Sequence, residues 1–146
     1  MLIRFMLVTL FGVFATVAAE VPKPIAHWKF DDKGDVARDS AGSHHGKIVG
    51  AKRASGKVGR SLEFARKQGH RVEIPFAPDF ALSTFTVSAW VYLTREPTFS
   101  GILGTRHGGD QTFDMKVNAA KVHGDIGNGK RWIETNRANY SVQALS

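Results

Sequence analysis

Short runs of alternating apolar and polar residues recur along the chain from residue 26 onward. The clearest run spans residues 84–93. Its apolar face consists of Phe85, Val87, Ala89, Val91 and Leu93. Trp90 and Tyr92 fall on the opposite face, because successive side chains of a strand alternate in direction. Strict alternation of β-branched and aromatic residues predicts a central strand over residues 84–93.

The rest of the chain continues this pattern. Further short runs predict strands over residues 26–30, 46–49, 61–65, 71–74, 102–105, 112–117, 121–126 and 131–135. Turn residues separate them, as in the Gly- and Asp-rich stretch 106–110 and the Gly-Asn-Gly at 127–129. Helical periodicity is almost missing. Many short strands at regular spacing predict an all-β fold, an antiparallel β-sandwich.

The N-terminus has the composition of a secretory signal. Arg4 supplies a positive charge, residues 5–17 are largely apolar, and small residues end the stretch at Ala18 and Ala19. This pattern predicts a signal peptide over residues 1–19, with an uncleaved signal anchor as the alternative. A short leader then covers residues 20–25, and one domain covers residues 26–146. We expect a secreted or extracytoplasmic protein whose mature chain does not span a membrane.

Charge and cysteine content narrow the choice of partners. The chain has a formal net charge of +7 and contains no cysteine, so an exported domain of this kind cannot rely on disulfides. Its basic residues are scattered, without a run of like charges. A basic surface favours acidic partners, and for an exported protein an acidic polysaccharide is favoured over nucleic acid. A solvated basic surface without a specific partner is the alternative.

Several motifs occur in a characteristic order. They are WKFD at residues 28–31, DSAG at 39–42, HGKIVGA at 45–51, GKVGRSLEF at 56–64, VEIP at 72–75 and FTVSAWV at 85–91. Together they resemble the front half of a LamG-like jelly-roll domain of the concanavalin A-like lectin/glucanase superfamily, over about residues 26–126. The resemblance implies a jelly roll that binds carbohydrates or cell surfaces. The family's later Trp-containing strand and Tyr-x-Asp-Gly hairpin have no counterpart after Tyr140, which implies an incomplete jelly roll.

An acidic cluster lies in the first loops. It consists of Asp31, Asp32, Asp35 and Asp39. Calcium takes six to eight oxygen ligands from carboxylates and carbonyl groups, and the family resemblance implies a calcium ion in such a loop. Asp31 and Asp39 are the expected ligands. The alternative is that these residues serve only as turn formers, since Asp and Gly favour turns.

Aromatic residues are the candidates for ligand binding. Trp90, Tyr92 and Trp132 are expected to contact a sugar ring, while Trp28 is expected in the core. For Trp90 and Tyr92 core packing is an open alternative, because both faces of a strand inside a sandwich can be covered. The six histidines lack the spacing of a zinc motif.

The sequence contains no catalytic constellation. Glycoside hydrolysis usually needs two positioned carboxylates, and the Glu-x-Asp-x-x-Glu pattern of the family's hydrolases does not occur. We therefore expect a non-catalytic module that binds a polysaccharide or cell-surface glycan, not an enzyme. A protein-binding adhesion module is one alternative. A fragment of a larger glycan-acting enzyme, or a truncated remnant, is another.

Overall fold

Strands dominate the computed structural model of the chain. It describes residues 22–94, 99–105, 112–118, 121–127, 132–134 and 140–141. Every strand pairing among them is antiparallel. Their only helical segments are two single-turn 3₁₀ helices, η1 (Arg66–Gln68) and η2 (Pro78–Phe80). The prediction of an all-β fold is therefore confirmed.

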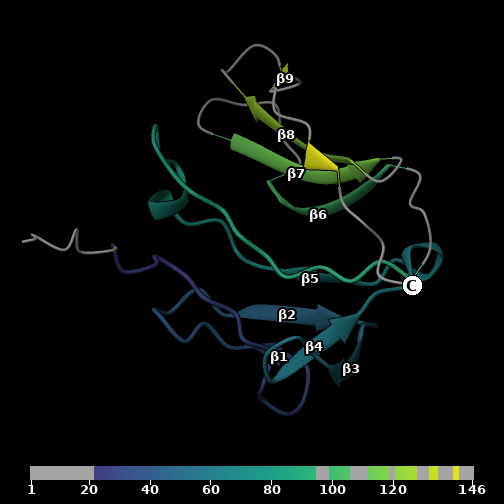
Figure 1. The fold of residues 1–146 in the computed structure, drawn as a ribbon. Helices are drawn as coiled ribbons and strands as arrows, with labels where there is room; N and C mark the ends of the chain where they lie inside the picture. The colour runs from purple at the N-terminus through teal and green to yellow at the C-terminus, as the bar shows by residue number, and fades with distance from the viewer. Residues whose placement is uncertain are drawn as a thin grey trace, which may run out of the picture.

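The N-terminal part forms two small sheets. Strands β1 (Val36–Ala37), β2 (Gly46–Val49) and β5 (Arg71–Glu73) make a three-stranded sheet in the order β1-β2-β5. Strands β3 (Lys52–Ser55) and β4 (Arg60–Glu63) make a separate hairpin. These sheets form the lower layer in Figure 1.

Gly46 allows β2 to lie close to the segment that contains β5. A Cβ atom at this position would lie 2.7 Å from Cγ1 of Val72 and 3.0 Å from Cγ1 of Ile74. Such approaches are too close for a larger residue unless the neighbours move. A glycine at position 46 therefore allows β2 to approach the segment of β5 this closely.

Arg53 of β3 connects the hairpin to the preceding loop. Its guanidinium donates hydrogen bonds to the carbonyl oxygens of Phe30 (2.6 Å), Gly34 (3.0 Å) and Val36 (3.1 Å). Phe30 has a positive φ of 61°, a left-handed conformation that non-glycine residues rarely adopt. The planar guanidinium reaches three carbonyl groups at once, and it thereby holds the loop 30–36 in place.

The C-terminal part forms a five-stranded sheet. Strands β7 (Thr112–Asn118) and β8 (Lys121–Gly127) form its central hairpin. Strand β6 (Ser100–Gly104) pairs with β7, while β9 (Trp132–Glu134) and β10 (Tyr140–Ser141) both pair with β8. This sheet forms the upper layer in Figure 1.

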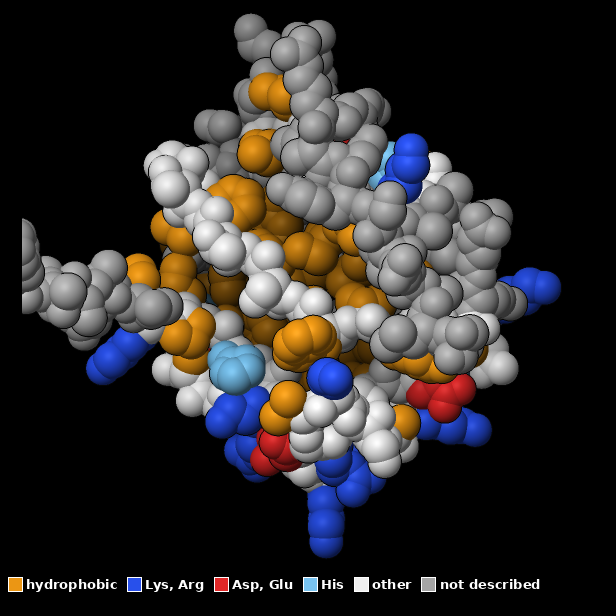
Figure 2. All heavy atoms as spheres, in the orientation of Figure 1, with side chains coloured by type: hydrophobic (Ala, Val, Ile, Leu, Met, Phe, Trp, Pro, Cys, Tyr) orange, Lys and Arg blue, Asp and Glu red, His pale blue; other side chains and the backbone are white. Residues whose placement is uncertain are grey.

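The core of the described residues is small. Ala37, Ile48 and Val117 are their only buried apolar side chains. A cavity of about 230 Å³ lies against β7 and β8, and apolar side chains dominate its lining, among them Phe85, Val87, Phe113 and Met115. Figure 2 shows hydrophobic side chains gathered in the gap between the two layers. The two layers therefore cover each other only in part.

Most of the predicted strands correspond to observed ones. The runs at 46–49, 61–65, 71–74, 102–105, 112–117, 121–126 and 131–135 match β2 and β4 to β9 within one or two residues at each end. The sequence did not predict β1, β3 or β10. The run at 26–30 forms only a single bridge, between Trp28 and Asp39.

The prediction of a central strand over residues 84–93 was wrong. These residues form no strand and pair with none of the described strands. The expected alternation of buried and exposed side chains is seen only at the start of the segment, where Phe85 and Val87 are half-buried and Thr86 and Ser88 are exposed. Further along, Ala89 and Val91 are exposed although they belong to the apolar face. Side-chain pattern alone does not make a strand, because a ladder also needs a neighbouring edge whose backbone groups are free.

Candidate functional site

Asp39 organises the loop that follows β1. Its side chain is buried (6% exposed), and its Oδ1 accepts hydrogen bonds from the backbone N–H groups of His27 (2.8 Å) and Ala41 (2.9 Å). Its Oδ2 accepts a third from the N–H of His44 (3.1 Å). The backbone N–H of Asp39 donates to Nδ1 of His45 at 3.0 Å. One carboxylate thus fastens the N-terminal segment to the loop 39–45.

These hydrogen bonds set the charge of Asp39. Burial alone would raise its pKa, but backbone N–H groups of His27, Ala41, His44 and Gly42 stabilise the carboxylate and lower the pKa from 3.8 to about 2. The carboxylate is therefore ionised at every physiological pH. Because the carboxylate oxygens of Asp39 already accept hydrogen bonds from backbone N–H groups, few of their lone pairs remain to bind a cation.

Asp31, the other expected calcium ligand, holds a different part of the chain. It is exposed, and its Oδ1 accepts the backbone N–H of Arg60 at 2.8 Å. No group of three or more histidine and acidic side chains in the described part of the chain could hold a metal ion. Calcium needs six to eight oxygen ligands, and the described carboxylates alone do not supply such a set. The calcium site stays a prediction without support in this geometry.

Trp28 has a structural place. Its indole Nε1–H donates to the backbone carbonyl of His44 at 2.7 Å, and its ring centroid lies 6.4 Å from that of Phe80. The ring of His44 lies 4.5 Å from Phe80, and Nε2 of His44 lies 3.0 Å from a carboxylate oxygen of Asp79. Trp28 therefore packs η2 against the N-terminal loop, but it is half-buried and does not belong to the buried core of the described residues that was expected for it.

Trp90 and Tyr92 project into solvent. They are 80% and 70% exposed, respectively, so the alternative that both pack into a core does not describe them. We call these two residues the aromatic pair. In an extended chain, residues two apart point the same way and lie roughly 7 Å apart. The aromatic pair thus offers two exposed aromatic rings that are two positions apart in the sequence.

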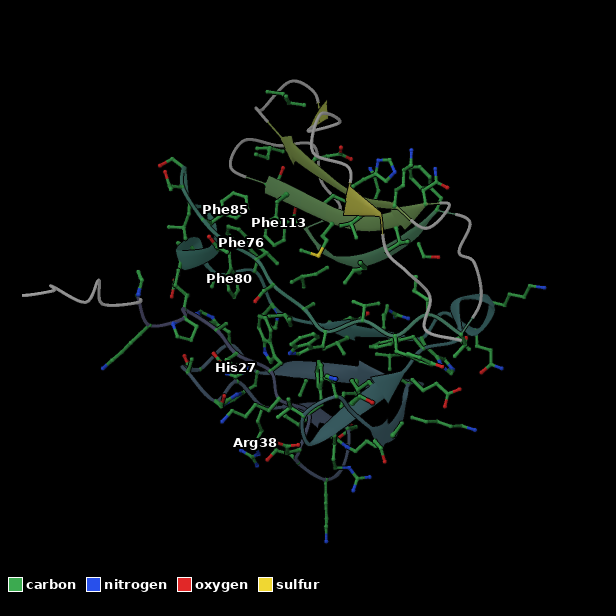
Figure 3. All side chains as sticks on the ribbon, viewed as in Figure 1. His27, Arg38, Phe76, Phe80, Phe85 and Phe113 are labelled. Atoms are coloured by element: carbon green, nitrogen blue, oxygen red, sulfur yellow. The ribbon has the colours of Figure 1, made fainter. Side chains whose placement is uncertain are left out.

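The start of the same segment anchors the aromatic pair to the upper layer. Phe85 and Val87 are half-buried, and the ring centroid of Phe85 lies 5.3 Å from that of Phe113 in β7. Figure 3 shows Phe85 and Phe113 next to each other between the layers, with Phe76 and Phe80 below them. The segment is therefore fixed at one end by packing and exposed at the other.

Trp132, the third expected binding residue, is the first residue of β9. Its backbone pairs with Gly127 of β8. Its side chain lies outside the described part of the structure, and its role as a ligand-binding residue stays a prediction. The structure therefore leaves Trp90 and Tyr92 exposed, and the aromatic pair is the candidate site.

A charged triad that the sequence did not predict lies across β7 and β8. Nζ of Lys116 forms ion pairs with the carboxylates of Asp125 and Asp114, the latter at 3.4 Å. The side chain of Asp125 is only 5% exposed. Nζ of Lys116 also lies 5.0 Å from the ring centroid of Phe99, close enough for a cation–π contact.

The two carboxylates of the triad stabilise the charged form of Lys116. Burial alone would lower the pKa of Lys116, but the hydrogen bond and charge of Asp125, together with the charge of Asp114, raise it above 10.5. Both carboxylates therefore face a permanent ammonium group. Such an arrangement links β7 to β8 through one cation.

The register of the hairpin explains how the triad forms. Asp114 lies directly opposite Asp125, and Lys116 lies opposite His123. The signal in the sequence was the pair of alternating charged runs, Asp114-x-Lys116 and His123-x-Asp125, on either side of a short turn. Two predicted strands with a known register would have placed these side chains on one face.

No family model matches the chain, and no curated protein or solved structure was found to be similar to it. The described residues contain no helix that is long and apolar enough to cross a membrane. The predicted signal peptide, residues 1–19, lies outside the described part of the chain. The LamG-like resemblance therefore rests on the sequence motifs alone.

Proposed function

We propose that the protein is an exported, non-catalytic module that binds a polysaccharide or cell-surface glycan through the aromatic pair, Trp90 and Tyr92. The domain is then a LamG-like jelly roll. The two antiparallel layers agree with a sandwich of this kind, and the sequence motifs carry the family assignment. Export rests on the signal-like composition of residues 1–19.

The exposure of the aromatic pair is the observation that carries this proposal. Large aromatic side chains are costly to leave in water, and exposed apolar patches mark interaction sites. The C–H faces of a sugar ring are apolar while its hydroxyl groups remain in solvent, so a sugar can cover an aromatic ring without losing its hydration. In an extended segment two such rings would lie roughly 7 Å apart, a spacing at which both could contact neighbouring sugars of one chain.

Charge favours an acidic glycan. The chain has a net charge of +7, and Figure 2 shows Lys and Arg side chains projecting around the lower layer. A positive field raises the local concentration of an anionic polysaccharide and weakens as salt is added. We therefore expect retention on uronic-acid or sulfated polysaccharides to exceed retention on neutral ones, and to fall with ionic strength.

The acidic side chains with buried or paired carboxylates already have partners. Asp39 accepts backbone hydrogen bonds, and Asp114 and Asp125 hold Lys116. None of these three carboxylates is placed as a free acid–base pair of the kind that cleaves glycosidic bonds. This arrangement supports binding without turnover.

Affinity electrophoresis over a panel of acidic and neutral polysaccharides tests the proposal. The wild-type protein should be retarded by at least one polysaccharide, and Trp90→Ala and Tyr92→Ala should each lose most of that retardation. Stacking on one aromatic ring contributes about 1 kcal/mol, so each substitution should weaken binding roughly fivefold. Phe76→Ala is the matched control, because Phe76 is 74% exposed and lies outside the pair.

Two outcomes would contradict the proposal. One is the absence of retardation by every polysaccharide in the panel, which would favour the protein-binding alternative. The other is equal retardation of the wild type, Trp90→Ala and Tyr92→Ala, which would place glycan binding elsewhere. Release of reducing sugar from a retained polysaccharide would show catalysis and would overturn the non-catalytic assignment.

A further inference from the structure

Residues 82–94 combine an unpaired backbone with a complete absence of charge. None of their backbone N–H or carbonyl groups forms a hydrogen bond with another described residue. Figure 1 draws the segment as a long line without an arrow across the middle of the molecule. No Asp, Glu, Lys, Arg or His occurs between Phe80 and Thr94. Within the part of the chain that the structure describes, this is a long, uncharged stretch of backbone without hydrogen bonds, in a basic protein.

The middle of this segment is open to a partner. Residues 88–92 are all exposed, including Ala89 and Val91, whose side chains would face a core if the predicted strand were covered. An unpaired extended stretch rich in β-branched and aromatic residues is a template for strand pairing with another chain. Backbone polar groups that find such a partner exchange hydrogen bonds with water for hydrogen bonds with protein.

A second copy of this chain fits the segment. Copies with a net charge of +7 repel each other, so a contact between them is favoured where both surfaces are uncharged. The segment is also self-complementary. If Ala89 faces Ala89 across a two-fold axis, Val87 faces Val91 and Phe85 faces Leu93. A two-fold interface requires this kind of match, because one patch contacts its own copy.

We propose that residues 84–93 of two copies pair as antiparallel strands about a two-fold axis at Ala89. In this register each face of one strand lies beside the same face of the other strand. On the face that carries the aromatic pair, Ser88 then faces Trp90 and Thr86 faces Tyr92. It completes the strand that the alternation of residues 84–93 predicts, and it pairs the free segment of both copies at once. Both aromatic pairs come to lie on one face of the resulting ribbon. The dimer does not depend on the proposed glycan binding.

Charge reversal at Ala89 tests the register. Ala89 is exposed, so neither Ala89→Lys nor Ala89→Glu requires burial of a charge in the monomer. In the dimer, each substitution places two like charges directly opposite each other. Like charges directly opposite each other repel, so the dissociation constant should rise roughly tenfold or more. An equimolar mixture of the two variants should restore the dimer by pairing opposite charges.

Sedimentation velocity of the purified protein at increasing concentration gives the measurement. We expect a wild-type monomer–dimer equilibrium, monomers for each charged variant alone, and dimers for their mixture. Val58→Lys is the control, because Val58 lies in the exposed β3–β4 turn and is 76% exposed; it should dimerise like the wild type. Ser88→Lys should weaken the dimer less than Ala89→Lys, because its lysine faces Trp90 of the second copy.

A wild type that sediments as a monomer at every concentration would overturn the proposal, whatever the variants do. Association of Ala89→Lys and of Ala89→Glu as strong as that of the wild type would also overturn it. Because sedimentation requires no glycan, its failure is distinguishable from a failure of glycan binding. Glycan retention by a strictly monomeric protein would refute the dimer and leave the glycan-binding proposal intact.

Discussion

Asp39 shows how a single residue can determine the path of a loop. Its carboxylate satisfies backbone donors on both sides of the N-terminal loop from a buried position. The DSAG motif predicted a turn at this place but did not predict that the side chain of Asp39 is buried. The hydrogen bond to His27 joins residues that are twelve positions apart, and such a contact cannot be inferred from local turn propensity.

Replacement of Asp39 by alanine should destabilise the protein strongly. Three backbone N–H groups would lose a charged acceptor, and we expect a loss of about 3 kcal/mol in the free energy of unfolding. Urea denaturation followed by circular dichroism at neutral pH measures it. Asp35→Ala is the control, because Asp35 lies exposed in the preceding loop. Equal stability of the two variants would contradict the role assigned to Asp39.

The contribution of Asp39 should depend on pH in a defined window. The folded-state pKa is about 2, below the ordinary value of 3.8, so the ionised form is favoured by folding. This stabilisation is present in full above about pH 4 and is lost as pH falls toward 2. Linkage gives at most about 2 kcal/mol for it. The stability difference between wild type and Asp39→Ala should therefore shrink across this range, and a constant difference would contradict the account.

Arg53 should not tolerate a change to lysine. The guanidinium donates to three carbonyl groups in a fixed geometry, whereas a lysine ammonium is a single compact donor group. We expect Arg53→Lys to lose about 1–2 kcal/mol in the free energy of unfolding. Arg38→Lys serves as control, because Arg38 is exposed and makes only a 3.7 Å ion pair with Asp32. Similar stabilities for both variants would refute the role of Arg53.

At the level of elements, the positions of strands were easier to predict than the pairing between them. Seven of the predicted runs coincide with observed strands, because alternation and turn residues are local signals. The run at 84–93 has the strongest alternation of all and yet forms no strand in the described structure. Pairing is a property of two segments, so it cannot be deduced from the pattern of one.

The charged triad should hold the β7–β8 hairpin together. Removing its only cation with Lys116→Met leaves Asp114 and the buried Asp125 opposite each other without compensation. Breaking a buried ion pair in this way costs about 3 kcal/mol. Chemical denaturation should show this loss, and Asp125→Asn added to Lys116→Met should recover part of it. The control is Lys121→Met at the exposed start of β8, where a change under about 0.5 kcal/mol is expected.

Recovery by the double variant separates the electrostatic explanation from a packing defect. A lost cation–π contact between Lys116 and Phe99 would persist in the double variant, whereas repulsion between two carboxylates would not. If Asp125→Asn added to Lys116→Met is no more stable than Lys116→Met alone, the triad does not act through charge.

At the level of the whole molecule, the described residues form two layers that cover each other incompletely. Only Ala37, Ile48 and Val117 are buried apolar side chains among them, while Phe76, Trp90 and Tyr92 are largely exposed. The sequence indicated an all-β chain and selected Trp90 and Tyr92 as binding residues. Trp90 and Tyr92 are exposed because none of the described strands pairs with residues 84–93. Only the structure shows this lack of pairing. The proposed function depends on this exposure.

The most direct test of that function is whether a bound glycan covers Trp90. Acrylamide quenching of tryptophan fluorescence should be compared with and without the polysaccharide that retards the protein most. We predict that the polysaccharide protects the wild type, and that Trp90→Phe removes the protectable emission while Tyr92→Phe retains it. Unchanged quenching of wild-type Trp90 in the presence of a retained polysaccharide would contradict the account, because the glycan would then bind away from the aromatic pair.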